Sequence, residues 1–237
     1  VAQAAGEKLV TGDGVKGIVG ADCSGVTGAV LSNVAVPNGI VMVSPSATSP
    51  ALSTAEDNGL FFRTAPSDAR EGEVAADIMI ERGIKTAALT YTNNDYGKGL
   101  AEAIAASFTA KGGVITIQAA HEDGKADYSA EVGALAAAGG DILIVAGYLD
   151  QGGAGIIQAA LDTGAFSTFQ LPGGMIGTSM DERFGPALGA IGTMTVAEVA
   201  GAHDRIENSR GMLDDLRQCA GKRRRIEAEH QRHRHIG

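Results

Sequence analysis

The chain has 237 residues, of which 44% are hydrophobic and 4% aromatic, with 34 glycines and no tryptophan. This length is enough for one or two domains with a sizeable core. Residues 1–200 hold 10 Lys and Arg against 22 Asp and Glu, whereas residues 201–237 hold 9 against 6. The acidic body argues against nucleic acid as the main partner, and no stretch reaches the ~18 apolar residues of a membrane span.

The first residues read as the end of a helix stopped by Gly12 and Gly14, with no initiator Met and no signal peptide before them. We therefore expect the natural N-terminus to be missing, so the absent signal peptide says nothing about the compartment. The two cysteines, Cys23 and Cys219, are too few to indicate a redox environment. The sequence favours two free thiols over a disulfide between them.

Short apolar segments alternate with helical segments along most of the chain. This rhythm predicts an α/β protein with parallel sheets and right-handed helical crossovers. The expected strands or extended segments are 15–20, 40–43, 60–66, 84–91, 114–120, 141–147, 168–171 and 191–197. The expected helices are 1–9, one ending near 37, 67–82, 99–111, 127–138, 152–163 and 180–188.

The segment 40–50 carries the clearest local signal. Four apolar residues, 40–43, run into a cluster of hydroxyl side chains at Ser44, Ser46, Thr48 and Ser49. The apolar run predicts a strand buried on both faces. Ligands of open α/β sheets bind beyond the carboxyl ends of the strands, so these hydroxyls and free N–H groups should hold a small polar ligand.

Motifs for covalent, metal or nucleotide chemistry are absent from the sequence. There is no phosphate loop, no GxGxxG after a strand, no CxxC pair, no HExxH and no GxSxG elbow. His121 stands alone and is expected at the surface, and Asp95 belongs to a sequence that favours a turn. We expect no metal and no cofactor.

Residues 201–237 break the α/β pattern. Lys222–Arg225 is a basic block, and three of the five histidines follow position 229. One interpretation is a tail that binds nucleic acid or a metal. We favour the other interpretation, a disordered or non-native basic terminus, because the composition changes abruptly and no α/β element needs this segment.

Five motifs occur in order over residues 1–197. They are ADCSGVT, SPSATSPAL, FFRTAPSD, TNNDYGKGL and Ala-Gly-Tyr at 146–148. Together they resemble the periplasmic leucine/isoleucine/valine-binding protein family, the substrate-binding components of branched-chain amino-acid ABC transporters. The resemblance implies a two-lobe type I periplasmic binding protein fold, with an incomplete first lobe over 1–65, a second lobe over 66–200 and an atypical tail over 201–237.

The same resemblance implies the function. A protein of this family is not an enzyme; it binds a branched-chain or related small amino acid or amide between its lobes and delivers it to an ABC permease. It is periplasmic, or lipid-anchored and extracellular in a bacterium without an outer membrane. Two other functions stay open: a sensory or regulatory domain of the same fold, and a flavodoxin-like enzyme that uses Asp95 or Ser24.

The resemblance also implies which residues hold the ligand. Ser24, the backbone of Ala47 and Thr48 would bind the ligand carboxylate, since N–H and O–H donors stabilise a negative charge. From the other lobe, Tyr96 and Tyr148 would pack on the ligand or bond to it. Ser46 belongs to the same motif, although capping or turn formation explains it more simply.

Three departures from the family pattern bear on this site. Gly173 stands where the family usually has an acid that pairs with the ligand ammonium, so either Asp150 or Asp181 substitutes, or the ligand is not a simple α-amino acid, or affinity is weak. The chain starts late and lacks the expected return to the first lobe after about residue 197. Cys23 matches a position that is disulfide-bonded in some relatives, and its partner would lie in the missing segment.

Overall fold

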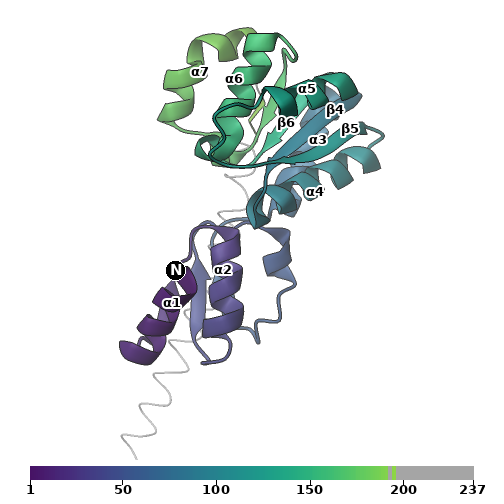
Figure 1. The fold of residues 1–237 in the computed structure, drawn as a ribbon. Helices are drawn as coiled ribbons and strands as arrows, with labels where there is room; N and C mark the ends of the chain where they lie inside the picture. Colours follow the sequence, from purple (N-terminus) through teal and green to yellow (C-terminus); the bar gives the residue numbers. More distant parts are fainter. Residues whose placement is uncertain (192–193, 196–237) are drawn as a thin grey trace, which may run out of the picture. The chain divides into compact units, whose positions relative to one another are not determined.

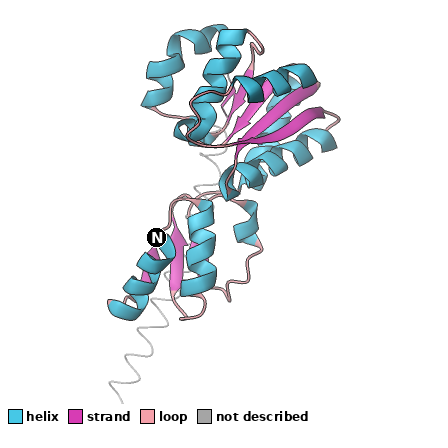
Figure 2. Ribbon diagram, in the orientation of Figure 1, coloured by secondary structure: helices cyan, strands magenta, loops and turns pink. Residues whose placement is uncertain are grey.

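The chain forms two parallel β-sheets in a computed structural model that describes residues 1–191 and 194–195, with side chains through residue 184 (Figures 1 and 2). The smaller sheet has the order β1-β2-β3 and the larger one β5-β4-β6-β7-β8, and every strand pair is parallel. The strands are β1 Gly17–Val19, β2 Val41–Ser44, β3 Phe61–Arg63, β4 Thr86–Thr92, β5 Val114–His121, β6 Ile142–Ala146, β7 Phe169–Leu171 and β8 Met194–Thr195. The predicted α/β class with parallel sheets is confirmed.

Helices connect these strands along the chain. The α-helices are α1 Ala2–Glu7, α2 Ser24–Val30, α3 Asp68–Glu81, α4 Asp95–Ala110, α5 Ser129–Ala138, α6 Ala154–Thr163 and α7 Thr178–Ile191. Short π or 3-10 turns lie at Lys8–Gly12, Leu31–Ala35, Pro50–Ser53, Leu149–Gly153 and Gly173–Met175. No helix in the described part of the chain is long and apolar enough to cross a membrane.

Two helical layers cover the larger sheet (Figure 1). Helices α3 and α4 pack on one face, and α5, α6 and the start of α7 pack on the other. The central strand β6 is therefore completely buried. Gly72 allows α3 and α4 to approach closely, because a Cβ at this position would lie 2.6 Å from the carbonyl carbon of Ala103.

Within the described residues, the smaller sheet is covered on one face only. Residues of α2 and its extension pack on Met42 to form a separate small core. On the opposite face, Val41 is 41% exposed, Phe62 45% and Val19 87%. The prediction that the strand at 40–43 is buried on both faces is therefore wrong: an unbroken apolar run does not distinguish a covered face from an open one, because that depends on elements elsewhere in the chain.

Helix α4 starts earlier than the sequence predicted, because an N-cap fixes its first turn. Helix α4 begins at Asp95, not at Gly99, because the Asn94 side chain accepts a hydrogen bond from the Gly97 N–H at 2.8 Å. This contact is an N-cap, so the sequence TNNDYG opens a helix and is not a free loop. Tyr96 is thereby fixed in the first helical turn.

Two other expectations, on His121 and on helix α7, are wrong, and the predictions for the tail cannot be compared with the described residues. His121 is not at the surface; it is 1% exposed inside the larger sheet. Helix α7 is longer than the expected 180–188. The tail 201–237, Cys219 and the last residues of the expected strand 191–197 lie outside the described residues.

Candidate ligand-binding site

A pocket of about 430 Å³ lies where the carboxyl ends of strands from both sheets lead into helices. Its lining comes from the start of α2, the start of α4 and the segment after β6. The lining residues are Cys23, Ser24, Gly25, Val26, Asn94, Asp95, Tyr96, Tyr148 and Gln151. The pocket thus brings together three of the seven predicted ligand-binding residues, namely Ser24, Tyr96 and Tyr148.

The two tyrosines form a packed pair. Their ring centroids lie 4.7 Å apart with an interplanar angle of 36°. Tyr96 is 6% exposed, whereas Tyr148 is half-buried. The preceding Gly147 has φ +148°, and a Cβ there would lie 2.0 Å from the Thr92 hydroxyl oxygen. Only glycine fits this turn, which places Tyr148 against Tyr96.

The hydroxyl-rich turn after β2 is bonded mostly to itself and to neighbouring backbone. Ser44 Oγ donates to the Ala21 carbonyl at 2.6 Å and accepts from the Ala47 N–H at 3.0 Å. Ser46 Oγ bonds to Asp22. The Ala47 N–H, predicted to bind a carboxylate, is therefore engaged by Ser44 in this structure.

Ser24 has a hydroxyl proton that no described residue accepts. Its Oγ accepts a hydrogen bond from the Ser49 N–H at 3.1 Å, and it is 4% exposed. No acceptor among the described residues takes the Ser24 hydroxyl proton. The hydroxyl can therefore still donate to a bound group in the pocket.

Arg63 holds the turn from the other side, a role that the sequence did not reveal. Its guanidinium donates to the carbonyls of Ala47 at 3.2 Å and Ser49 at 2.9 Å, and to Ser53 Oγ at 2.5 Å. Three donors in a rigid plane fix the position of the turn. The Thr48 carbonyl in turn accepts from the Asp68 N–H at 2.9 Å, which ties the turn to the start of α3.

Asp68 is the most unusual polar group of this region. It is 1% exposed, and neither carboxylate oxygen has a hydrogen-bond partner of good geometry among the described residues. Burial raises the pKa of Asp68 to about 7, and the nearby charge of Glu71 adds to the rise. The Thr48 hydroxyl and the Arg63 charge offset only part of it.

Glu71 lies one helical turn further on and reaches the loop after β7. Its Oε1 accepts a hydrogen bond from the Gly173 N–H at 3.1 Å. Burial raises the pKa of Glu71, and this bond offsets part of the rise. Burial and the negative charges of Glu71 and Asp68 raise the pKa of Tyr96 well above its ordinary value. The predicted site residue Gly173 thus contacts an acid of helix α3 that the sequence analysis did not connect with the site.

The two acids proposed as substitutes for Gly173 lie elsewhere. Asp150 and Asp181 are both exposed, and neither lines the pocket of the tyrosines. The signal that could have identified Asp68 and Glu71 is their spacing: two acids three residues apart lie on one face of a helix, directly after the motif that contains Arg63.

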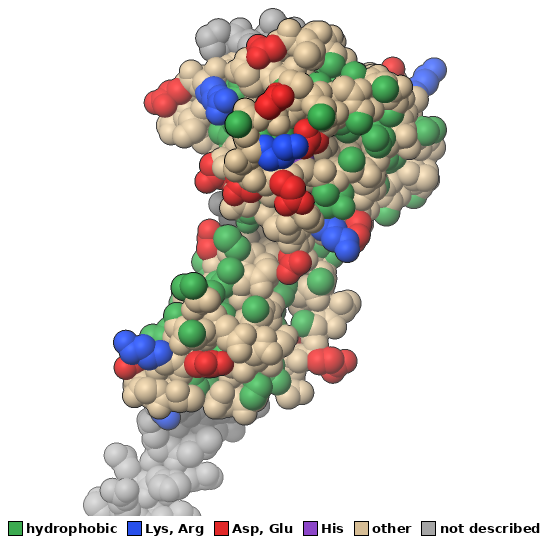
Figure 3. Space-filling view, viewed as in Figure 1, with side chains coloured by type: hydrophobic (Ala, Val, Ile, Leu, Met, Phe, Trp, Pro, Cys, Tyr) green, Lys and Arg blue, Asp and Glu red, His purple; other side chains and the backbone are tan. Residues whose placement is uncertain are grey.

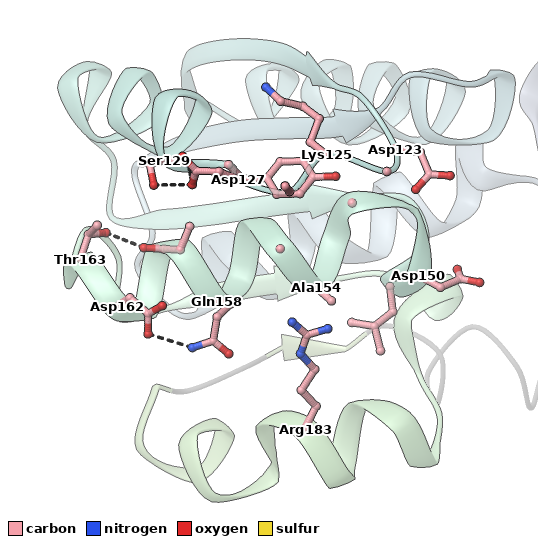
Figure 4. A pocket seen from close by; sticks show the side chains of 17 residues that line it. Asp123, Lys125, Asp127, Ser129, Asp150, Ala154, Gln158, Asp162, Thr163 and Arg183 are labelled. Atoms are coloured by element: carbon pink, nitrogen blue, oxygen red, sulfur yellow. Dashed lines mark hydrogen bonds between the residues drawn. The ribbon is translucent and has the colours of Figure 1, made fainter.

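A second pocket, of about 440 Å³, lies between α5, α6 and the start of α7 (Figure 4). Asp150 lines it, but none of the seven predicted ligand-binding residues does, and several of its polar groups have protein partners. Ser129 donates to Asp127, Gln158 donates to Asp162, and Lys125 forms an ion pair with Glu131. Nothing in this pocket points to a ligand.

Neither the surface charges nor the arrangement of metal-binding side chains indicates a further site among the described residues. On the face shown in Figure 3, acidic side chains are scattered with a few basic ones between them, and no continuous basic patch is visible. Within the described residues, no group of three His, Cys, Asp or Glu side chains is placed to hold a metal ion. Cys23 forms no disulfide with any described residue.

Comparison with known proteins settles the family. The sequence profile of the periplasmic binding protein family matches residues 1–228. The chain belongs to this family. Its resemblance to the leucine/isoleucine/valine-binding proteins is confirmed by a relative from Brucella melitensis, Leu/Ile/Val-binding protein homolog 3, which is 38% identical over 149 residues, covering 61% of this chain and 39% of the relative.

Solved structures of this family share the fold. The branched-chain amino acid transporter substrate-binding protein LivJ of Streptococcus pneumoniae, in complex with isoleucine, is 27% identical with a TM-score of 0.64, over 77% of this chain and 51% of that one. A solute-binding protein of an ABC transporter from R. palustris, in complex with benzoate, is 22% identical with a TM-score of 0.69, over 78% and 51%. The chain thus spans about two fifths to one half of the relatives it matches.

Proposed function

We propose that this periplasmic binding protein chain belongs to the substrate-binding component of an ABC transporter and binds a branched-chain or related small amino acid. The observation that carries the proposal is the convergence of Ser24, Tyr96 and Tyr148 on one pocket of about 430 Å³. A hydroxyl donor suits the ligand carboxylate, and two packed rings suit an apolar side chain. The named ligands of the relatives, leucine, isoleucine and valine, combine these two chemistries.

The proposal includes the arrangement around the pocket. Residues 1–65 and 66–200 form the two lobes, built on the smaller and the larger sheet, and the ligand lies between them. The partner is an ABC permease, and the protein works in the periplasm or on the outer surface of a bacterium without an outer membrane. The proposal assigns no catalytic role to the chain: the Ser24 hydroxyl accepts from the Ser49 N–H, and no base among the described residues bonds to it.

Calorimetric titration with leucine, isoleucine and valine tests this proposal, with thermal unfolding as a second readout. A ligand at ~100 times its Kd adds about 2.7 kcal/mol to the free energy of unfolding, which is a shift of several degrees in Tm. Replacement of Tyr148 by Ala removes one pocket wall and should weaken binding at least tenfold. Ser129→Ala, in the second pocket, is the matched control and should leave Kd unchanged. Equal affinities of the two variants would refute the site.

A further inference from the structure

We propose that Gln151 is a specificity-determining residue of the ligand pocket, whose side-chain amide donates a hydrogen bond to an oxygen in the side chain of the ligand. The proposed function supplies the pocket and the amino-acid ligand, so this inference rests on it. It extends the ligand class from apolar side chains to small side chains that carry a hydroxyl or amide oxygen, of which threonine is the simplest.

The first argument is the direction in which the Gln151 amide is held. Asn94 caps helix α4 through its Oδ1, which accepts a hydrogen bond from the Gly97 N–H at 2.8 Å. Because a backbone N–H can only donate, this bond identifies the Asn94 oxygen and leaves the Asn94 Nδ2 group as a donor. That Nδ2 donates to Gln151 Oε1 at 3.0 Å. The oxygen of the Gln151 amide is thus engaged, and Nε2 is the end that remains for a ligand.

The second argument is that Gln151 Nε2 is accessible and has no acceptor among the described residues. It forms no hydrogen bond there, and it is not one of the buried atoms that lack a partner. Gln151 and Asn94 both line the pocket of about 430 Å³ that contains Ser24, Tyr96 and Tyr148. An accessible donor that no protein group satisfies bonds to water, so a ligand that displaces this water must supply an acceptor in its place.

The third argument is that the backbone of Gln151 is fixed. Its carbonyl accepts a hydrogen bond from the Thr92 hydroxyl at 3.2 Å. Gly152 follows with φ +91°, and a Cβ there would lie 2.7 Å from Cδ2 of the His121 ring. Only glycine fits this position, so the turn after β6 packs directly on His121. A donor on a fixed turn loses little conformational entropy on binding, which favours specific recognition.

The position of Gln151 assigns its donor to the ligand side chain and not to the ligand carboxylate. The Ser24 hydroxyl, at the start of α2, suits the carboxylate. Gln151 follows β6 on the same segment as Tyr148, which packs on Tyr96. The proposed function places the ligand side chain against these two rings. The pocket therefore offers that side chain an aromatic wall and an amide donor, which suits a side chain with both a methyl and a hydroxyl group.

The test compares threonine with valine, because the two differ only in the hydroxyl that replaces one methyl group. Both are titrated calorimetrically against the unmodified chain and against Gln151→Met, which keeps the length of the side chain and removes the amide. A pocket with apolar walls alone disfavours the hydroxyl by up to about 100-fold. We expect the unmodified chain to bind threonine at least as tightly as valine. In Gln151→Met the ratio of the two affinities should move toward valine by about tenfold.

Gln158→Met is the matched control. It makes the same substitution on helix α6, where Gln158 donates to Asp162 and lies outside the pocket of the tyrosines (Figure 4). It should leave both affinities unchanged. Thermal unfolding shows whether each variant folds. If Gln151→Met does not fold, the comparison of threonine with valine on the unmodified chain decides by itself.

The outcomes separate the two proposals. Tighter binding of valine than of threonine by the unmodified chain would overturn the role of Gln151, while the proposed binding function stands. Equal weakening of both ligands in Gln151→Met would show that Gln151 only supports the turn, and would also overturn the inference. A folded chain that binds neither amino acid overturns the proposed function and this inference with it.

Discussion

Two buried ionisable side chains of this protein lie in contrasting surroundings. His121 at the end of β5 and Asp68 at the start of α3 are each 1% exposed. Both ring nitrogens of His121 have partners, the hydroxyls of Thr90 at 2.9 Å and Thr92 at 3.2 Å. The carboxylate oxygens of Asp68 have no hydrogen-bond partner of good geometry among the described residues, and the nearby Thr48 hydroxyl offsets only part of the rise in its pKa. Two side chains with the same burial therefore differ in how well the fold satisfies their polar atoms.

Both ring nitrogens of His121 are satisfied by protein partners, so its burial can be explained without a ligand. Thr92 donates its proton to the Gln151 carbonyl at 3.2 Å, so it accepts from Nε2–H of His121, and Nδ1 accepts from Thr90. This pattern assigns a neutral imidazole. Burial lowers the pKa of His121 to about 4, and neighbouring acids offset part of the effect. His121 thus supports the loop that carries Gln151 and needs no ligand.

The largest expected effect comes from neutralising Asp68. Its folded pKa of about 7 lies above the ordinary value of 3.8, so the folded state holds the proton more tightly and stability falls as pH rises from about 4 to 7. Asp68→Asn should therefore raise the free energy of unfolding of the unliganded chain by about 2–4 kcal/mol at pH 8 and by little at pH 4. Urea unfolding at both pH values measures this, and a destabilised variant at pH 8 would show that Asp68 is paired.

The contribution of His121 to the free energy of unfolding should depend on pH in the opposite direction to that of Asp68. Its folded pKa of about 4 lies below the ordinary 6.5, so this group contributes stability above pH 6.5 that is lost as pH falls toward 4. The expected loss is about 3 kcal/mol. In His121→Asn this part of the acid destabilisation should disappear, as urea unfolding between pH 7 and 4 would show. An unchanged pH profile would mean that His121 ionises inside the fold.

A smaller effect is expected from breaking one bond of the His121 network. Thr90→Val keeps the shape of the side chain but removes the hydroxyl that bonds to Nδ1. The ring nitrogen then stays buried without a partner, which should cost about 1–3 kcal/mol in thermal or urea unfolding. Thr163→Val is the control, because the Thr163 hydroxyl bonds only to helix backbone at an exposed position. A loss no greater than that of the control would contradict the comparison.

The smallest expected effect concerns the helix that carries Asp68 and Glu71. Ser67 caps α3 by accepting a hydrogen bond from the Ala69 N–H at 3.3 Å. Ser67→Ala should lower the free energy of unfolding by about 1 kcal/mol. An unchanged free energy of unfolding in this variant would contradict the contribution of the cap.

Much of the architecture could be predicted from local pattern. Alternating apolar and helical segments indicated the parallel α/β fold, and most strands lie within a few residues of their expected positions. The family motifs indicated Ser24, Tyr96 and Tyr148, and the pocket contains all three. The role of each in binding stays a prediction.

Only the tertiary structure decided which polar residues lie together. Glu71 bonds to Gly173, which is 102 positions away, and His121 bonds to Thr90 at a separation of 31. In the sequence, Glu71 is one more acid in a first helical turn and His121 a lone polar residue. Burial and hydrogen bonding depend on chain segments that meet only on folding, so a local pattern carries the period of an element but not the environment of its side chains.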